Sequence, residues 1–339
     1  MKALFIGGTG TISTAITQLA PGCGFELYLL NRGNKSELVP QGVKVIEADI
    51  YNEDDVKNKL KDLTFDVVAE FIAFDVEALK RDVRLFAGKT KQYIFISSAS
   101  AYQKPLSSPF ITESTPLANP FWEYSRKKIA CEEYLMEEYR NNGFPVTIVR
   151  PSHTYGDTGI PIAIHGKKGS YSVISRIKQG KKVILHGDGS SLWTVTHNTD
   201  FAKAFVGLMG NVHAIGEALQ ITSDESLTWN QIYEVIGNVL GVRPQIVHIP
   251  SDTLSKANNE FVGALLGDKA NTVIFDNSKI KRLVPGFTAA VRFDQGARRT
   301  LAYIEKHPEL QAADPEFDAW TDQMIAAYEA FEAKLPHLN

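Results

Sequence analysis

The chain has 339 residues, of which 44% are hydrophobic and 22% charged, so it holds enough apolar material for one large core or two joined cores. A formal net charge of −3 gives no global electrostatic reason to expect nucleic acid or an anionic membrane as the partner, and a small-molecule substrate fits better. Its two cysteines are too few for a disulfide framework and fit a reducing compartment.

No targeting or membrane segment is expected. The first apolar run breaks at Gly7, too early for the core of a signal peptide, and no stretch approaches the roughly 20 apolar residues of a spanning helix. The sequence also lacks the CxxC and HExxH spacings typical of metal sites. We therefore expect a soluble, cytoplasmic protein without a metal.

The first half of the chain alternates short β-branched or aromatic runs with longer amphipathic stretches, which is typical of βαβ units. We expect strands over residues 2–6, 25–30, 43–47, 66–70, 93–97 and 146–149, and helices over 11–20, 54–60, 76–86 and 121–140. The strands are nearly continuous apolar runs, as strands covered by helices on both faces require. This rhythm predicts an α/β fold with a doubly wound parallel sheet, the Rossmann arrangement.

The pattern changes after Pro151. A Gly- and Lys-rich stretch comes first, with an expected helix at 170–179 and a strand near 183. A helix at 199–209 and a strand at 218–222 are then expected to return to the sheet. The rest of the chain is mostly helical, with expected helices at 232–240 and 318–334. We expect two domains: a dinucleotide-binding domain of residues 1–155, rejoined by about 196–225, and a smaller substrate-binding lobe of 156–195 and 226–339.

A glycine loop joins the first strand to the first helix, with the sequence Gly7-Gly8-Thr9-Gly10-Thr11-Ile12-Ser13. Glycines there permit a tight turn and let backbone N–H groups approach a pyrophosphate. Ser13 replaces the usual third glycine, and glycine turns between a strand and a helix also occur without a ligand. The candidate pyrophosphate-binding residues are Gly7, Thr9, Gly10, Thr11 and Ile12.

The second and third strands end in candidate residues for the adenosine half of the cofactor. Asn31 and Arg32 stand where a carboxylate would bind the ribose 2′-hydroxyl of NAD, so Arg32 could stack on adenine or pair with a 2′-phosphate, which favours NADP over NAD; a solvated arginine is the alternative. Asp49, followed by Ile50, could accept a hydrogen bond from the adenine amino group or cap the following loop.

The candidate reaction centre comprises Tyr124, Lys128 and Ser98. Tyr124 and Lys128 are four residues apart and share one helix face, so the ammonium can stabilise the phenolate of a side chain whose ordinary pKa of about 10 makes it a poor base. Ser98, at the end of the fifth strand, could bind the substrate oxygen. A Tyr-x-x-x-Lys spacing alone is also frequent on purely structural amphipathic helices.

The order of these motifs over residues 1–240, with Arg150-Pro151-Ser152-His153 after the sixth strand, resembles the extended short-chain dehydrogenases, the NAD-dependent epimerase/dehydratase family. The resemblance implies that Tyr124 is the acid/base, that Lys128 also binds the nicotinamide ribose and that Ser98 orients the substrate. It further implies that Pro151 borders the nicotinamide and that Ser100 and His153 face the substrate, although a satisfied loop histidine is the alternative for His153.

The sequence departs from the members that act on nucleotide sugars. Gly187-Asp188-Gly189 is present, but Trp193 takes the place of the arginine that holds the diphosphate. A tryptophan cannot pair with a phosphate, although its ring could stack on a base or an apolar group. His197 and Asp200 are expected to start the next helix.

The leading hypothesis is an NAD(P)-dependent oxidoreductase, epimerase or dehydratase that acts on a hydroxyl or carbonyl of a small substrate, with sugars and sugar nucleotides as candidates. The alternative is a dinucleotide-binding regulatory or RNA-binding protein, because the scaffold resembles that of chloroplast stem-loop-binding proteins, but the negative net charge speaks against it. A redox sensor would need no Tyr–Lys pair. The family resemblance also implies a possible homodimer through the helices at 76–86 and 121–140.

Overall fold

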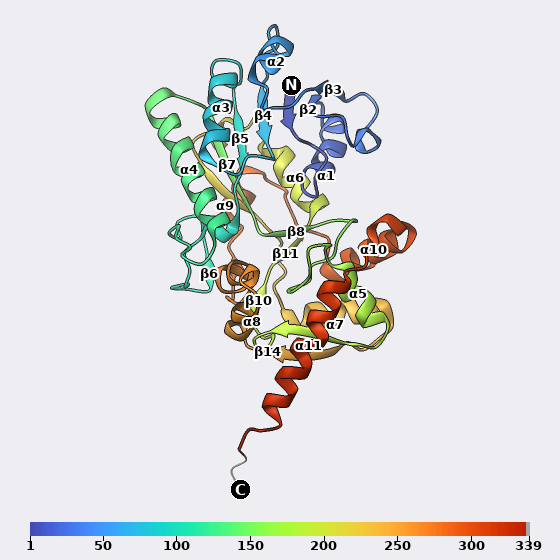
Figure 1. The fold of residues 1–339 in the computed structure, drawn as a ribbon. Helices are drawn as coiled ribbons and strands as arrows, with labels where there is room; N and C mark the ends of the chain where they lie inside the picture. Colours follow the sequence, from blue (N-terminus) through green and yellow to red (C-terminus); the bar gives the residue numbers. More distant parts are fainter. Residues whose placement is uncertain (337–339) are drawn as a thin grey trace. The chain divides into compact units, whose positions relative to one another are not determined.

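The computed structural model describes residues 1–336, which form two compact units (Figure 1). Unit 1 comprises residues 1–154, 196–224 and 275–290, and the described part of unit 2 comprises 155–195, 225–274 and 291–336. Within the described residues, no helix combines the length and the apolar character that crossing a bilayer requires.

A seven-stranded parallel sheet forms the centre of unit 1, in the order β12-β7-β5-β4-β1-β2-β3. The strands are β1 (Lys2–Ile6), β2 (Glu26–Asn31), β3 (Lys44–Glu47), β4 (Val67–Glu70), β5 (Tyr93–Ile96), β7 (Val146–Pro151) and β12 (Ala218–Ile221). This confirms the predicted doubly wound α/β fold, and β12 is the strand expected to return to the sheet after residue 200. The strand order reverses between β1 and β4, and ligands of such sheets bind beyond the carboxyl ends of the strands at that point.

Helices cover both faces of the sheet, as the continuous apolar strands predict. Their bounds are α1 (Ser13–Leu19), α2 (Glu53–Lys59), α3 (Val76–Phe86), α4 (Glu123–Asn142), α6 (Asn198–Leu208) and α9 (Ser278–Leu283). One buried core includes side chains of α1, α6 and α9, and a second includes side chains of α2, α3 and α4. The sheet edge that carries the candidate site is therefore held between two separate apolar layers.

The segment 275–290 corrects one expectation, because it lies in unit 1 and not in the substrate-binding lobe. Ile280 is fully buried and Phe287 is nearly so, and both belong to the core that also contains α1 and α6. The Asn277 amide donates to the backbone oxygen of Thr222, just after β12, at 3.0 Å. Apolar burial and this hydrogen bond together assign the segment to the sheet domain.

Unit 2 contains helices and short strands. Its helices are α5 (Tyr171–Lys178), α7 (Trp229–Leu240), α8 (Ser251–Ala257), the π-helix η5 (Val262–Lys269), α10 (Phe293–Lys306) and α11 (Pro315–Glu332). Strand β9 (Lys182–His186) pairs in parallel with β14 (Gln245–Ile249), and β10 (Leu192–Trp193) pairs with β13 (Leu227–Thr228). The strand β14 was missed, because the sequence after residue 227 was expected to be mostly helical. Further short strands are β6 (Phe110–Ile111), β8 (His153–Tyr155), β11 (Val195–His197) and β15 (Ile274–Phe275).

Candidate active site and cofactor pocket

The glycine loop after β1 has a backbone shape that only glycine adopts easily. Gly7 and Gly8 have φ values of +98° and +96°. A Cβ at Gly8 would lie 2.7 Å from Leu29 Cδ2, so a side chain there would require the Leu29 side chain on the neighbouring strand to move. Ser13, the departure from the usual third glycine, accepts a hydrogen bond from the Gly10 N–H at 2.9 Å through its hydroxyl. The loop is thus compatible with close approach of a pyrophosphate, and Ser13 helps to fix its shape.

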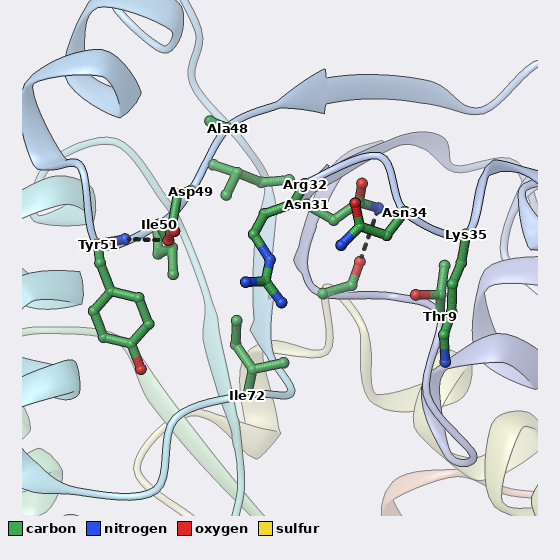
Figure 2. Close-up of a pocket in the computed structure, with 12 residues that line it drawn as sticks. Thr9, Asn31, Arg32, Asn34, Lys35, Ala48, Asp49, Ile50, Tyr51 and Ile72 are labelled. Carbon is green, nitrogen blue, oxygen red and sulfur yellow. Dashed lines mark hydrogen bonds between the residues drawn. The ribbon is translucent and has the colours of Figure 1, made fainter.

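A pocket of about 300 Å³ opens at the carboxyl ends of β1 and β2 (Figure 2). Its lining includes predicted cofactor residues from three separate segments, namely Gly7, Thr9, Asn31, Arg32, Asp49 and Ile50, together with Leu30, Asn34, Lys35, Ala48, Tyr51 and Ile72, which the sequence did not single out. Gly10, Thr11, Ile12, Lys128 and Pro151 are not among the residues that line this pocket. The structure therefore brings together the residues predicted for the adenosine half of a dinucleotide.

The end of β2 contributes an amide and basic side chains to this pocket. Asn31 Oδ1 accepts from the Gly33 N–H at 2.9 Å, while Asn31 Nδ2 donates to the Gly7 carbonyl at 3.4 Å, so this amide joins the two loops. Figure 2 shows the Arg32 side chain extending from the strand end toward Ile72. Lys35 also lines the pocket, so the side of the pocket next to β2 carries two cationic groups, Arg32 and Lys35.

Asp49 shapes the loop after β3 and also lines the pocket. Its Oδ1 accepts from the Tyr51 N–H at 3.0 Å, as the dashed line in Figure 2 shows. The cap of α2 is a different residue, Asn52, whose side chain accepts from the Asp55 N–H. The exposed carboxylate of Asp49 is therefore in a position to reach a ligand as well as to stabilise its own turn.

Lys128 is buried on α4, with 3% of its surface exposed. Its Nζ donates to the carbonyls of Ala73 and Ile96, each at 2.8 Å, and lies 4.7 Å from the ring centroids of Phe74 and Phe95. Burial lowers the pKa of Lys128 to about 8, because no carboxylate compensates fully for the lost hydration. The ammonium is thus fixed by one backbone oxygen at the end of β5 and one in the turn that follows the neighbouring strand β4.

Tyr124 lies on the same face of α4 as Lys128. The Lys128 Nζ is 5.9 Å from the Tyr124 ring centroid, and the half-buried tyrosine ring contacts Trp122 and Phe74 at centroid distances of 5.1 and 6.1 Å. The helix spacing of four residues accounts for this proximity. The structure therefore brings the two predicted residues of the reaction centre together on one helix face.

Ser98 is the first of a series of hydroxyls that ends on α4. It caps the short helix η3 (Ala99–Ala101), where its Oγ accepts from the Ser100 N–H at 3.2 Å and lies 2.9 Å from Ser100 Oγ. Ser125, next to Tyr124, donates its hydroxyl to Ser100 Oγ at 2.8 Å. Ser100 is only 3% exposed and Ser98 is half-buried, so Ser98 is the more accessible of the two predicted serines.

The other predicted substrate residues lie in different surroundings. Pro151 is the last residue of β7, and the half-buried His153 begins β8 two residues later. Trp193 belongs to unit 2, where its buried ring stacks on Trp229 at a centroid distance of 5.9 Å. The predicted helix-starting role of His197 is confirmed, because its side chain caps α6 by accepting from a backbone N–H.

Sequence reasoning missed a buried glutamate at the end of β4. Glu70 is fully buried, and its Oε1 accepts from the N–H groups of Ile72 and Ala73 at 2.5 and 2.8 Å. The available signal was the presence of an acidic residue in the otherwise apolar run at 67–74. Among residues 1–336, no group of three or more His, Cys, Asp or Glu side chains is arranged to hold a metal ion.

The strand order, the glycine loop and the adjoining pocket define a Rossmann fold. Residues 76–221 match the model of the NAD dependent epimerase/dehydratase family. A 2′-dehydrokanamycin reductase of Streptomyces kanamyceticus is 22% identical over 85% of this chain and 80% of the relative. A chloroplast stem-loop binding protein of 41 kDa from Arabidopsis thaliana is 25% identical over 73% of this chain and 65% of its own length.

Solved structures share the fold. The UDP-glucuronic acid 4-epimerase from Bacillus cereus, in complex with NAD, superposes with a TM-score of 0.73 over 90% of this chain and 99% of the epimerase, at 19% identity. The dTDP-glucose 4,6-dehydratase from Bacillus anthracis, also with NAD, gives the same TM-score over 91% of this chain and 98% of the dehydratase, at 20% identity. These likenesses extend over nearly the full length of each chain.

Proposed function

We propose that this protein is an NAD(P)-dependent enzyme that oxidises or reduces a carbinol centre of a small, sugar-like substrate, with Tyr124 as the acid/base. The observation that carries this proposal is the buried ammonium of Lys128, 5.9 Å from the Tyr124 ring and fixed by two backbone carbonyls. A buried, oriented positive charge beside a phenol lowers the free energy of the phenolate.

The proposed mechanism assigns one role to each side chain. Ser98 donates its hydroxyl to the substrate oxygen and holds it near Tyr124, which accepts the proton during oxidation or returns it during reduction. Lys128 keeps the phenolate stabilised and, by family resemblance, also binds the nicotinamide ribose. A bound nicotinamide would supply or accept hydride. Pro151 would border the nicotinamide, while Gly7, Thr9 and the start of α1 would hold the pyrophosphate.

The proposed substrate class rests on the similarity to a reductase and on one difference from the enzymes that act on nucleotide sugars. The relative that aligns over 85% of this chain is named a reductase, which supports a carbonyl or carbinol as the reacting group. Trp193 stands where nucleotide-sugar enzymes carry a phosphate-binding arginine, and its ring packs on Trp229. We therefore place a sugar-like substrate without a nucleoside diphosphate ahead of a sugar nucleotide, with Ser100 and His153 as further proposed contacts.

Exchange of Tyr124 for phenylalanine tests the chemistry. We expect Tyr124→Phe to lower kcat for hydride transfer at least about 100-fold, the typical contribution of acid–base catalysis, and to leave the Kd for NADPH and NADH within about twofold. Tyr134→Phe, on the same helix but without a contact to Lys128 in the described site, is the matched control and should retain activity. A Tyr124→Phe variant as active as the wild type would refute the assigned role.

NADP is proposed over NAD because Arg32 and Lys35 line the pocket and β2 ends in an amide instead of a carboxylate. Arg32→Glu should raise the Kd for NADPH about 100-fold while changing that for NADH less than about threefold, because only the 2′-phosphate is repelled. Lys57→Glu, an equal charge change on exposed α2 outside the pocket, controls for net charge. An equal loss of affinity for NADPH and NADH would refute the proposed preference for NADP.

The similarity to a chloroplast stem-loop binding protein favours RNA binding as a second candidate function. The net charge of −3 makes strong electrostatic binding of a polyanion unfavourable. Titration of structured RNA at two salt concentrations would distinguish the candidates: salt-dependent affinity without turnover of any carbonyl or carbinol would reverse their order.

A homodimer through α3 and α4 is also proposed, since these helices contact each other and the family resemblance implies this interface. Light scattering of the purified protein across a dilution series tests it, and a monomer at all concentrations would contradict it.

A further inference from the structure

A cluster of buried charged and polar side chains lies behind the cofactor pocket in unit 1. Glu70 at the end of β4, Arg81 and Asp82 on α3, and Tyr93 at the start of β5 are each at most 4% exposed. Placing two carboxyl groups and one guanidinium inside an apolar domain has a high desolvation cost. A cluster of this kind therefore needs specific partners for each of its polar groups.

Asp82 provides the acceptors for most of the donors in the cluster. Its Oδ1 accepts from Arg81 Nε and Nη2 at 2.9 and 2.8 Å, and its Oδ2 accepts from the Tyr93 hydroxyl at 2.6 Å. Arg81 Nη2 is 3.8 Å from the nearest Glu70 oxygen, which is longer than a hydrogen bond. Arg81 is thus hydrogen-bonded to Asp82 and forms a longer ion pair with Glu70 Oε2, so the hydrogen bonds to Glu70 Oε1 come from other donors.

The hydrogen bonds to Glu70 Oε1 come from backbone N–H groups of the turn that follows β4. The donors are Ile72 and Ala73, the first of which lines the dinucleotide pocket. The carbonyl of Ala73 in turn accepts from Lys128 Nζ at 2.8 Å. One carboxyl oxygen of Glu70 therefore fixes a turn that contributes Ile72 to the lining of the pocket and one of the two carbonyls that bind the Lys128 ammonium.

We propose that Glu70 is a positioning residue of the reaction centre, acting through the turn at 71–74 to fix Lys128 beside Tyr124 and to place Ile72 against the dinucleotide. This inference rests on the proposed function for its catalytic consequence, but the placement of Lys128 by Glu70 can be tested without turnover. Burial, reinforced by the charge of Asp82, raises the pKa of Glu70 well above its usual range, and a neutral carboxyl group would still accept both N–H bonds.

The other wall of the pocket is linked to the same cluster. The Arg81 guanidinium carbon lies 4.9 Å from the ring centroid of Tyr51, a residue that is 72% exposed and lines the pocket. Figure 2 shows the Arg32 side chain pointing toward Ile72, with Tyr51 to one side of both. The cluster thus contacts two residues that line the predicted adenosine site, Tyr51 through Arg81 and Ile72 through Glu70.

The test compares Glu70→Leu with Glu70→Gln. Leucine removes the acceptor, whereas glutamine has an amide oxygen that can accept both N–H groups. We expect the rate at which an amine-acylating reagent labels Lys128, followed by mass spectrometry, to rise at least about tenfold in Glu70→Leu, because the ammonium loses the Ala73 anchor, and to stay within about twofold of wild type in Glu70→Gln. The Kd for the preferred cofactor should follow the same pattern, with about a tenfold loss only in Glu70→Leu.

Tyr93→Phe is the matched control within the cluster. It removes the hydroxyl bond to Asp82 but touches neither the turn nor Lys128, so it should lower Tm while leaving Lys128 labelling and cofactor Kd unchanged within about twofold. Labelling in Glu70→Leu equal to that in wild type, or an equal increase in Tyr93→Phe, would overturn the positioning role.

Two further outcomes separate this inference from the proposed function. If the wild type binds neither NADPH nor NADH, the proposed function fails, yet Lys128 labelling still decides the role of Glu70. If Glu70→Leu does not fold, hydrogen exchange of the wild type decides it: slow exchange of the Ile72 and Ala73 amides supports the bonds to Glu70, and rapid exchange of both would overturn the proposal.

Discussion

Lys128 offers a test in which stability and activity respond to pH in opposite directions. Its ammonium is almost fully buried, and burial lowers its pKa to about 8, against 10.5 for an ordinary lysine. Below pH 8 the group is charged in both the folded and the unfolded chain, so the folded state bears the full desolvation penalty. Between pH 8 and 10.5 the unfolded chain binds the additional proton, and the free energy of unfolding rises with pH.

The expected size of this effect follows from the two pKa values. A depression from 10.5 to about 8 corresponds to ~3 kcal/mol. Lys128→Met has no titrating group, so the wild type should gain ~3 kcal/mol relative to this variant between pH 8 and 10.5. Denaturant unfolding at half-unit pH steps measures the difference, in which the titrations of all other groups cancel.

Activity should move the other way. Loss of the Lys128 proton removes the charge that stabilises the Tyr124 phenolate, so kcat should fall as the pH rises through about 8, and Lys128→Met should be low in activity at every pH. Lys127→Met is the control, because Lys127 is exposed on the same helix and pairs with Glu123. Unfolding curves of wild type and Lys128→Met that differ by a constant amount at all pH values would refute the desolvated ammonium, and undiminished activity above pH 9 would refute its catalytic role.

Three further predictions concern stability. Gly8→Ala should cost about 2 kcal/mol and weaken cofactor binding, because the new Cβ meets Leu29 at a positive φ; calorimetry and a cofactor titration check it. Glu132→Gln should lower the free energy of unfolding by about 3 kcal/mol, since the buried Arg150 loses its bidentate charged partner, and an unchanged urea midpoint would contradict this. Thr228→Ala should cost about 1 kcal/mol in unit 2 by removing a capping box, with an unchanged cofactor Kd.

The strands and helices of the sheet domain could be predicted because their signals are local. Continuous apolar runs of four to six residues gave the positions of β1 to β5 to within about one residue, since a strand covered on both faces admits few polar side chains. The glycine loop and the shared helix face of Tyr124 and Lys128 could also be predicted, because backbone freedom and helix periodicity depend on neighbouring residues alone.

Pairings between segments that are distant in the sequence could not be predicted in this way. Strand β14 follows a strongly helical segment and is defined by its parallel partner β9, which lies some 60 residues earlier. The segment 275–290 was expected in the substrate-binding lobe, and only the burial of Ile280 and Phe287 shows that it completes the sheet domain.

For the site, the sequence alone determined which residue types stand at the strand ends and on which helix face, because those features depend on spacing along the chain. The tertiary structure decided what holds them: Lys128 is fixed by carbonyls 55 and 32 residues earlier, and Ala73 is fixed by Glu70, the last residue of β4, which sequence reasoning did not single out. Such contacts depend on how parallel strands align their carboxyl ends, which hydrophobic periodicity within one segment does not encode.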